Sequence, residues 1–246
     1  MAPLNQKPVR LLMQDMAVSM GLTPGQSFTR EQAIQWFAEH YPNVKQGTIA
    51  AHLIRLSTNV PTRLHYSPAS DGSDDRFFKI DATHFRLYEP NTDPAPITHG
   101  TPPIVEPAND ESGEFAYEHD LRDYLALNLH LIEPSLKLYS DEGITGVEFP
   151  VGGRYIDILA VDAKGGYVVI ELKVSKGYDR VVGQLLRYVS WIKQHQADPG
   201  QAVRGVIVAK AISEDLQLAC SEIPGVSLFE YELSVKIRPV VVKRNG

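Results

Sequence analysis

The sequence contains a single cysteine, Cys220, so the chain cannot form an internal disulfide. Its neighbours Leu218 and Ala219 predict a small buried side chain rather than a nucleophile. No stretch is long and apolar enough to span a bilayer, and Met1–Arg10 lacks the apolar run of a secretory signal. We therefore expect a cytoplasmic protein in a reducing compartment, without a membrane partner.

A strong positive charge is also missing. The formal net charge of -6 excludes a protein that coats nucleic acid non-specifically, because that role needs many Lys and Arg residues to neutralise phosphates. It does not exclude local DNA contacts. Residues 1–90 carry 9 Lys/Arg and 8 Asp/Glu, which leaves 15 and 22 for the remainder, so the acidity lies in the C-terminal half.

Proline divides the chain. Six prolines fall between Glu89 and Ser112 among small polar residues, a composition that favours extended chain over packed structure. We predict an N-terminal domain over residues 1–90, a linker over 91–113 and a second domain over 114–246.

The N-terminal domain has the pattern of a small helical domain followed by a β-ribbon. Helical spacing predicts helices at Val9–Met20, after a Thr29 cap, and at Lys45–Ser57, while strand-like runs occur at 63–66 and 76–80. This order resembles a winged helix-turn-helix, whose last helix enters the major groove. The candidate DNA contacts on that helix are Lys45, Gln46, Thr48, His52 and Arg55. A helical domain used for dimerisation or protein binding is the alternative.

The sequence pattern of the C-terminal domain predicts an α/β fold with a mixed sheet. A helix at Phe115–Leu131 precedes strands at 147–151, 155–161 and 167–174, and a second helix follows at Asp179–His195. A strand at 206–209, a helix capped by Ser213 and a last strand at 226–233 complete the order α-β-β-β-α-β-α-β.

The strand at 167–174 carries two charges in an otherwise apolar run. Glu171 and Lys173 are two positions apart, so strand period places them on one face. If residues 162–166 form a hairpin loop, Val161 lies opposite Tyr167 and Asp157 lies opposite Glu171. Directly opposed residues have Cβ atoms about 5 Å apart, so the two carboxylates would face each other and repel.

A hard divalent cation would relieve this repulsion, because Mg²⁺ prefers oxygen ligands and is often held by one or two carboxylates plus substrate phosphate. We predict Mg²⁺ as the cofactor, with Mn²⁺ able to substitute, and Lys173 beside it orienting water or stabilising charge. Zinc is not expected, since the one Cys and the scattered His residues lack ligand spacing. Glu118 lies on the inward stripe of its helix and is a further metal-ligand candidate, while Gln184 and Tyr188 share a helix face toward the site.

Asp157 followed by Glu171-Leu172-Lys173 in an αβββαβ order resembles the PD-(D/E)xK nuclease superfamily, and Gln184–Tyr188 matches the QxxxY motif of its RecB-like branch. The segments 128–133, 153–162 and 182–188 resemble the catalytic domain of NucS-type endonucleases, over roughly residues 114–235. The resemblance implies a restriction-endonuclease-like core. It also implies that Asp157, Glu171 and Glu118 bind metal and that Lys173, Gln184 and Tyr188 complete the catalytic set. Arg154, in the same segment as Asp157, is a candidate DNA contact.

The N-terminal domain departs from this family, whose members carry a β-rich domain there. We therefore predict a Mg²⁺-dependent endonuclease that hydrolyses double-stranded DNA as a restriction or defence enzyme, with target selection by the N-terminal domain. A homodimer is expected because one such site cuts one strand. A NucS-like mismatch or structure-specific repair endonuclease is the alternative, and a non-catalytic winged-helix DNA-binding regulator is an alternative of another class. The recognition sequence, any need for modified bases and the cut pattern stay open.

Overall fold

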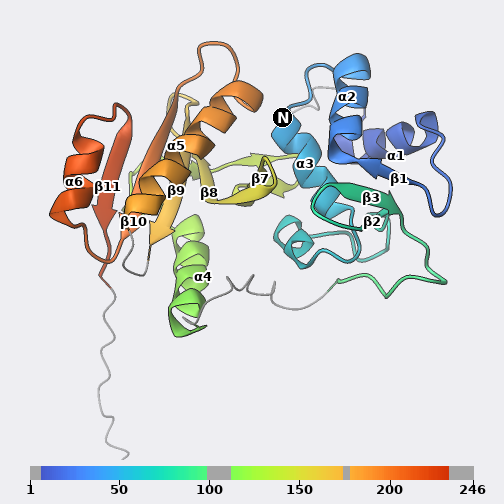
Figure 1. The fold of residues 1–246 in the computed structure, drawn as a ribbon, viewed down its shortest axis with the longest axis horizontal. Coiled ribbons are helices and arrows are strands. Elements are labelled where there is room, and N and C mark those ends of the chain that lie inside the picture. Colours follow the sequence, from blue (N-terminus) through green and yellow to red (C-terminus); the bar gives the residue numbers. More distant parts are fainter. Residues whose placement is uncertain (1–6, 99–111, 174–177, 233–246) are drawn as a thin grey trace, which may run out of the picture.

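The computed structural model describes residues 7–98, 112–173 and 178–232, with the backbone alone described at 112–117 and 178–179. Residues 7–98 are called the N-terminal module and residues 112–232 the C-terminal domain (Figure 1). The module consists of α1 (Val9–Ser19), β1 (Ser27–Thr29), α2 (Arg30–His40), α3 (Gln46–Arg55), the 3-10 helix η1 (Pro61–Tyr66), β2 (Phe77–Lys79) and β3 (His84–Leu87).

The three predicted helices of the module are confirmed. The Thr29 hydroxyl accepts a hydrogen bond from the Gln32 backbone N–H, and the Gln32 side chain accepts one from the Thr29 N–H, so a capping box starts α2. The three helices and the sheet enclose one apolar core that includes Met13, Phe37 and Leu53. The sheet is antiparallel with strand order β1-β3-β2.

The predicted strand at 63–66 is wrong, because this segment forms η1. Pro61 starts the 3-10 helix, and Arg63 turns inward, where its guanidinium is fully buried against Asp75, 2.8 Å away. The strand that pairs with β2 is instead β3, later in the chain. The assignment of the module as a winged helix stays a prediction.

The chain after β3 does not leave the module at residue 91 as expected. The Ile97 N–H donates to the Thr58 carbonyl at 2.9 Å, and the Asp93 carboxylate pairs with Arg86. Residues up to 98 therefore remain attached to the module, and the rest of the predicted linker, 99–111, lies outside the described residues.

The C-terminal domain has a mixed sheet, as predicted. Its helices are α4 (Ser112–Leu127), η2 (Leu129–Leu131), α5 (Tyr178–His195) and α6 (Glu214–Ser221). Its main strands are β7 (Val147–Val151), β8 (Arg154–Val161), β9 (Tyr167–Lys173), β10 (Val203–Ala209) and β11 (Val226–Glu230). Three short strands were not predicted: β4 (Lys137–Leu138), β5 (Ser140–Asp141) and β6 (Ile144–Thr145). The order is β11-β10-β9-β8-β4 with β7 also on β8. β9, β10 and β11 run parallel, and β8 runs antiparallel to β7 and β9.

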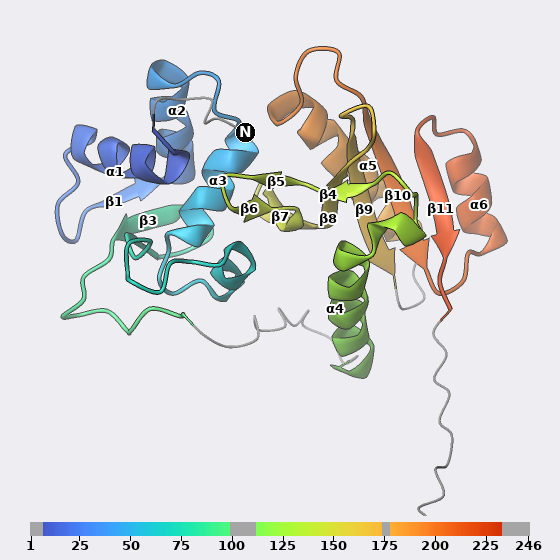
Figure 2. The same ribbon diagram turned by 180° about the vertical axis from the view of Figure 1, so that it is seen from behind.

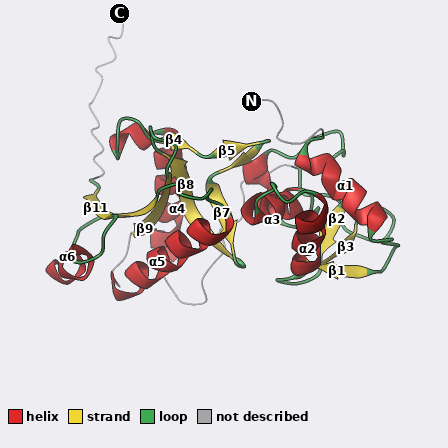
Figure 3. Cartoon of the chain, turned by 90° about the horizontal axis from the view of Figure 1, so that it is seen from above, coloured by secondary structure: helices red, strands yellow, loops and turns green. Residues whose placement is uncertain are grey.

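Helices cover both faces of this sheet (Figure 3). Leu121 and Leu125 of α4 pack with Ile170 and Leu172, whereas Leu185 of α5 belongs to the core on the opposite face. Successive residues of β9 thus point into two different apolar layers, one on each face of the sheet. None of the helices in the described parts of the chain is both long and apolar enough to traverse a membrane.

α3 lies between the two halves of the molecule, against β7 (Figures 1 and 2). All residues from Gly47 to Ile54 are buried, and Ala51 and Ile54 belong to the core of the C-terminal domain. Thr48 and His52 are 2% and 0% exposed. The prediction that this helix enters a DNA groove does not agree with the structure, because the face that carries its polar residues is covered.

The remaining candidates on α3 are engaged or half-buried. Lys45 pairs with Asp198 of the C-terminal domain at 2.6 Å, and Arg55 pairs with Asp74 at 3.0 Å. Gln46 is half-buried at the start of the helix. The residues of α3 that were predicted to contact DNA therefore do not form a free surface.

Candidate active site

The predicted register of the central hairpin is confirmed. Val161 lies opposite Tyr167, and the pairing continues to Ile158 opposite Ile170. Asp157 and Glu171 occupy the next position of this register, from β8 and β9. Asp157 Oδ2 accepts a hydrogen bond from the Leu172 N–H at 2.8 Å, which holds its carboxylate against β9.

Glu171 is an ionisable group in the interior. Its side chain is buried, and Oε2 accepts a hydrogen bond from Gln184 Nε2 of α5 at 2.7 Å. Oε1 is buried and has no hydrogen-bond partner among the described residues. Burial, and then the negative charge of Asp157, raise the pKa of Glu171 well above its ordinary value.

Two further carboxyl groups share this environment. Burial raises the pKa of Asp157, against the hydrogen bond from Leu172 and the charge of Lys173. Burial also raises the pKa of Glu118, against Lys173, whose Nζ lies 3.6 Å from Glu118 Oε1. Lys173 is thus a cation shared by acids that disfavour one another's ionised forms.

Tyr188 and Arg154 lie at the margin of this set. Tyr188 is buried, and burial followed by the charges of Glu171 and Asp157 raises its pKa to about 12. The charge of Arg154, which is exposed, acts in the opposite direction. The structure thus brings Glu118, Asp157, Glu171, Lys173, Gln184 and Tyr188 into one region, as the sequence predicts.

The carboxylates fit a metal ion that takes two protein ligands. Glu171 Oε1 and the neighbouring Asp157 provide the oxygen donors that Mg²⁺ prefers. Within the described residues, however, no three His, Cys, Asp or Glu side chains converge to hold an ion by themselves. The predicted set of Asp157, Glu171 and Glu118 is therefore not assembled in full, since Glu118 instead approaches Lys173.

The sequence reasoning missed Glu148. On β7, Val147 pairs with Ile158 and Phe149 pairs with Ile156, so the register places Glu148 opposite Asp157. Asp157 is therefore flanked by Glu148 on one neighbouring strand and Glu171 on the other. The signal was available, because a tight turn at Gly152-Gly153 aligns the strands in this register.

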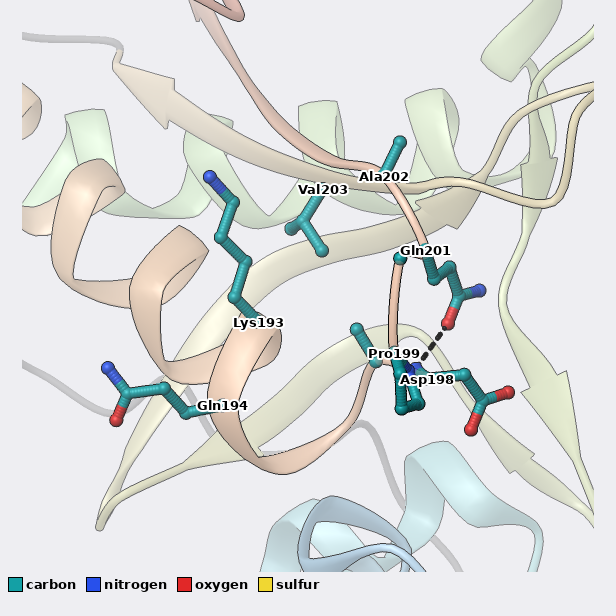
Figure 4. A pocket seen from close by; sticks show the side chains of 9 residues that line it. Lys193, Gln194, Asp198, Pro199, Gln201, Ala202 and Val203 are labelled. Atoms are coloured by element: carbon teal, nitrogen blue, oxygen red, sulfur yellow. Dashed lines mark hydrogen bonds between the residues drawn. The ribbon is translucent and has the colours of Figure 1, made fainter.

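A surface hollow of about 600 Å³ lies elsewhere, and Figure 4 shows it. It is lined by the end of α5 and the loop before β10, including Lys193, Asp198, Gln201 and Val203, and the Asp198 N–H donates to Gln201 Oε1 at 2.9 Å. β10 begins at Val203 and runs parallel to β9, whose far end carries Glu171 and Lys173. The hollow is thus separate from the acidic site.

The two halves match different family models. Residues 8–87 match a domain of unknown function (DUF7669), and residues 117–224 match the endonuclease NucS C-terminal domain. Endonuclease NucS of Pyrococcus furiosus is 39% identical over 67 residues, 27% of this chain and 24% of that protein. Endonuclease NucS 2 of Halobacterium salinarum is 32% identical over 129 residues, 52% of this chain and 46% of that protein.

A solved structure described as a repair endonuclease from Pyrococcus abyssi aligns with a TM-score of 0.38 and 23% identity, covering 61% of this chain and 52% of that one. The matches to these curated relatives span less than half of their length. The family model covers residues 117–224, which include Glu118, Asp157, Glu171 and Lys173. The C-terminal domain is therefore similar to the endonuclease NucS C-terminal domain over residues 117–224.

Proposed function

We propose that this protein is a divalent-metal-dependent DNA endonuclease whose active site lies at Asp157, Glu171 and Lys173. The burial of Glu171 carries the proposal. Glu171 is a carboxylate whose buried Oε1 makes no hydrogen bond within the described parts of the chain, and it lies beside a second carboxylate; this arrangement is costly, and folding alone gives no reason to keep it. Such clusters of acids with raised pKa values are characteristic of catalytic sites.

Asp157 and Glu171 would hold Mg²⁺, or Mn²⁺ in its place. When bound, the ion would supply a Lewis acid for the scissile phosphate and a lowered pKa for the attacking water. Lys173 provides the positive charge that stabilises negative charge on the phosphate, and Glu118 orients its ammonium from α4. Gln184 fixes the Glu171 carboxylate from α5.

We infer that the substrate is irregular DNA, mismatched or branched, rather than a specific sequence in intact duplex. The restriction hypothesis assigned target selection to the N-terminal domain, and the burial of Thr48 and His52 removes two of the DNA contacts expected there. The curated relatives of the C-terminal domain are NucS endonucleases, which favours the repair alternative. The homodimer stays a prediction, based on one active site cutting one strand.

The experiment compares three DNA substrates in Mg²⁺ and in EDTA: intact plasmid, methylated plasmid, and oligonucleotide duplexes with or without a mismatch or branch. We expect cleavage only of the irregular duplexes, and only with metal. Discrete bands from intact plasmid would restore the restriction hypothesis. Tight DNA binding without metal-dependent cleavage of any substrate would favour the non-catalytic regulator and overturn the proposal.

A further inference from the structure

Glu148 connects the acidic site to the N-terminal module. By the register of β7 and β8, Glu148 lies opposite Asp157. The residue pairs on either side of this position, Val147–Ile158 and Phe149–Ile156, are formed. The Glu148 backbone adopts φ +47°, a left-handed conformation that a residue with a Cβ rarely takes within a strand. Such a strained position persists only where the surroundings hold it.

The Glu148 carboxylate forms an ion pair with a side chain of α4. Arg122 Nη1 pairs with Glu148 Oε1, and the Arg122 side chain is only 5% exposed. The other carboxylate partner of Arg122 is Asp123, which is exposed on the same helix. The charges of Arg122 and Glu148 both act on Asp157, in opposite directions, so all three groups share one electrostatic environment.

η1 of the N-terminal module holds Glu148 from the other side. His65 Nε2 lies 3.2 Å from Glu148 Oε2, and the Tyr66 hydroxyl donates to the Glu148 backbone carbonyl at 3.2 Å. One segment of the module thus contacts both the side chain and the strained main chain of Glu148. Burial raises the pKa of Glu148, but His65 and Arg122 outweigh it and hold the pKa below its ordinary value, so the carboxylate is ionised and neutralises Arg122.

We propose that Glu148 is a positioning residue: it keeps the Arg122 guanidinium away from Asp157, and His65 and Tyr66 of the N-terminal module hold Glu148 in place. The inference rests on the proposed metal site at Asp157 and Glu171. Without Glu148, the carboxylates left to the buried Arg122 are the exposed Asp123, 2.8 Å away on the same helix, and the buried Asp157, on which its charge already acts. A guanidinium paired with Asp157 competes with the metal for the same oxygens. The N-terminal module thereby sets the metal affinity of an active site that lies in the other half of the chain.

The test measures metal binding by the full chain without DNA. Mn²⁺ is titrated into wild type, Glu148→Gln and the double variant Glu148→Gln/Arg122→Met, and free Mn²⁺ is followed by its EPR signal. We expect Glu148→Gln to weaken Mn²⁺ binding about 10- to 100-fold, the range for residues that orient metal ligands. The double variant regains most of the affinity, because Met fills the site of Arg122 without its charge. A purely structural role of Glu148 predicts no such rescue.

The contribution of the module is tested by His65→Ala, with Asp198→Asn as the matched control. Asp198→Asn removes the negative charge of the Lys45–Asp198 ion pair, which also joins the two halves but does not involve Glu148. We expect weaker Mn²⁺ binding in His65→Ala and unchanged binding in the control. Thermal unfolding of each metal-free variant verifies that it is folded.

Three results would overturn the inference: wild-type affinity in Glu148→Gln, no rescue by Arg122→Met, or equal affinities in His65→Ala and its control. If wild type binds Mn²⁺ and cleaves DNA while Glu148→Gln matches it in both, only this inference fails. If wild type binds Mn²⁺ but cleaves no DNA, the proposed function fails, and the affinities still decide the role of Glu148. If wild type binds no Mn²⁺, both fail.

Discussion

The Gln184 amide donates a hydrogen bond to Glu171 Oε2 at 2.7 Å and so links α5 to β9. It is the side-chain contact that fixes the orientation of Glu171, whose other oxygen is unpartnered among the described residues. The family motif on α5 thus has a specific structural role, which is to hold one carboxylate oxygen of Glu171 in place.

Replacing Gln184 with Ala should therefore lower metal-dependent cleavage. Without the amide, Glu171 can rotate, and residues that orient metal ligands are worth about 10- to 100-fold in metal affinity or activity. The measurement is the cleavage rate across a Mg²⁺ titration. Gln194→Ala, on an exposed position of the same helix, is the control and should leave the rate unchanged. Equal rates for the two variants would remove Gln184 from the site.

Glu171 should destabilise the metal-free protein above acidic pH. Its pKa is raised on folding from about 4.5, so the folded state binds the proton more tightly than the unfolded state. Stability is therefore lost as the pH rises from about 4.5 through the raised pKa. We expect Glu171→Gln to increase the free energy of unfolding by about 1–3 kcal/mol at pH 8, a typical size for a single substitution, and by nothing at pH 4.

Urea unfolding in EDTA at several pH values measures this effect. Glu222→Gln, at an exposed position after α6, is the control and should give no pH-dependent gain. Added Mg²⁺ should then stabilise wild type but not Glu171→Gln, because only wild type binds the ion in its folded state. A constant difference between Glu171→Gln and wild type across the pH range would contradict the raised pKa.

Lys173→Ala should abolish cleavage while DNA binding is retained. The ammonium lies 3.6 Å from Glu118 and provides positive charge beside the carboxylates, so its loss removes stabilisation of the reacting phosphate. We expect a fall of at least about 100-fold in the cleavage rate, as for loss of one preorganised donor. Lys193→Ala, at an exposed position of α5, controls for the loss of one positive charge. Unimpaired cleavage by Lys173→Ala would show that the active site lies elsewhere.

The acidic hairpin could be predicted from the sequence because its geometry is local. A five-residue loop joins β8 and β9, and Asp162 Oδ1 accepts hydrogen bonds from the N–H groups of Lys164 and Gly166, which fixes the turn. Strand period then determines the position of Glu171 relative to Asp157. The same reasoning applied to β7 and β8 would have located Glu148.

The roles of η1 and α3 could not be predicted, because both depend on distant parts of the chain. Arg63 has the local pattern of a strand residue, but its burial against Asp75 requires the loop that follows. Thr48 and His52 are polar and were assigned to a solvent-facing side of α3. α3 packs against β7, about a hundred residues later, and no periodicity within α3 shows which of its faces will be covered.

Gly47 offers a direct test of this docking. A Cβ at Gly47 would lie 2.7 Å from Phe149 Cζ of β7 and 2.5 Å from Gln196 Oε1, closer than side chains approach. Gly183, on α5, has no atom within 4 Å of the equivalent position. Ala is the better helix former by about 1 kcal/mol, so Gly183→Ala should raise the free energy of unfolding.

Gly47→Ala should lower the free energy of unfolding, by about 1–3 kcal/mol, because the added methyl overpacks the contact between α3 and β7. The two substitutions are chemically identical and both lie in helices, so the sign of the change reports on Phe149 and Gln196 alone. Urea unfolding of both variants measures it. Stabilisation by Gly47→Ala as well would mean that α3 stands clear of β7 in solution, and a free α3 would again be available to read DNA.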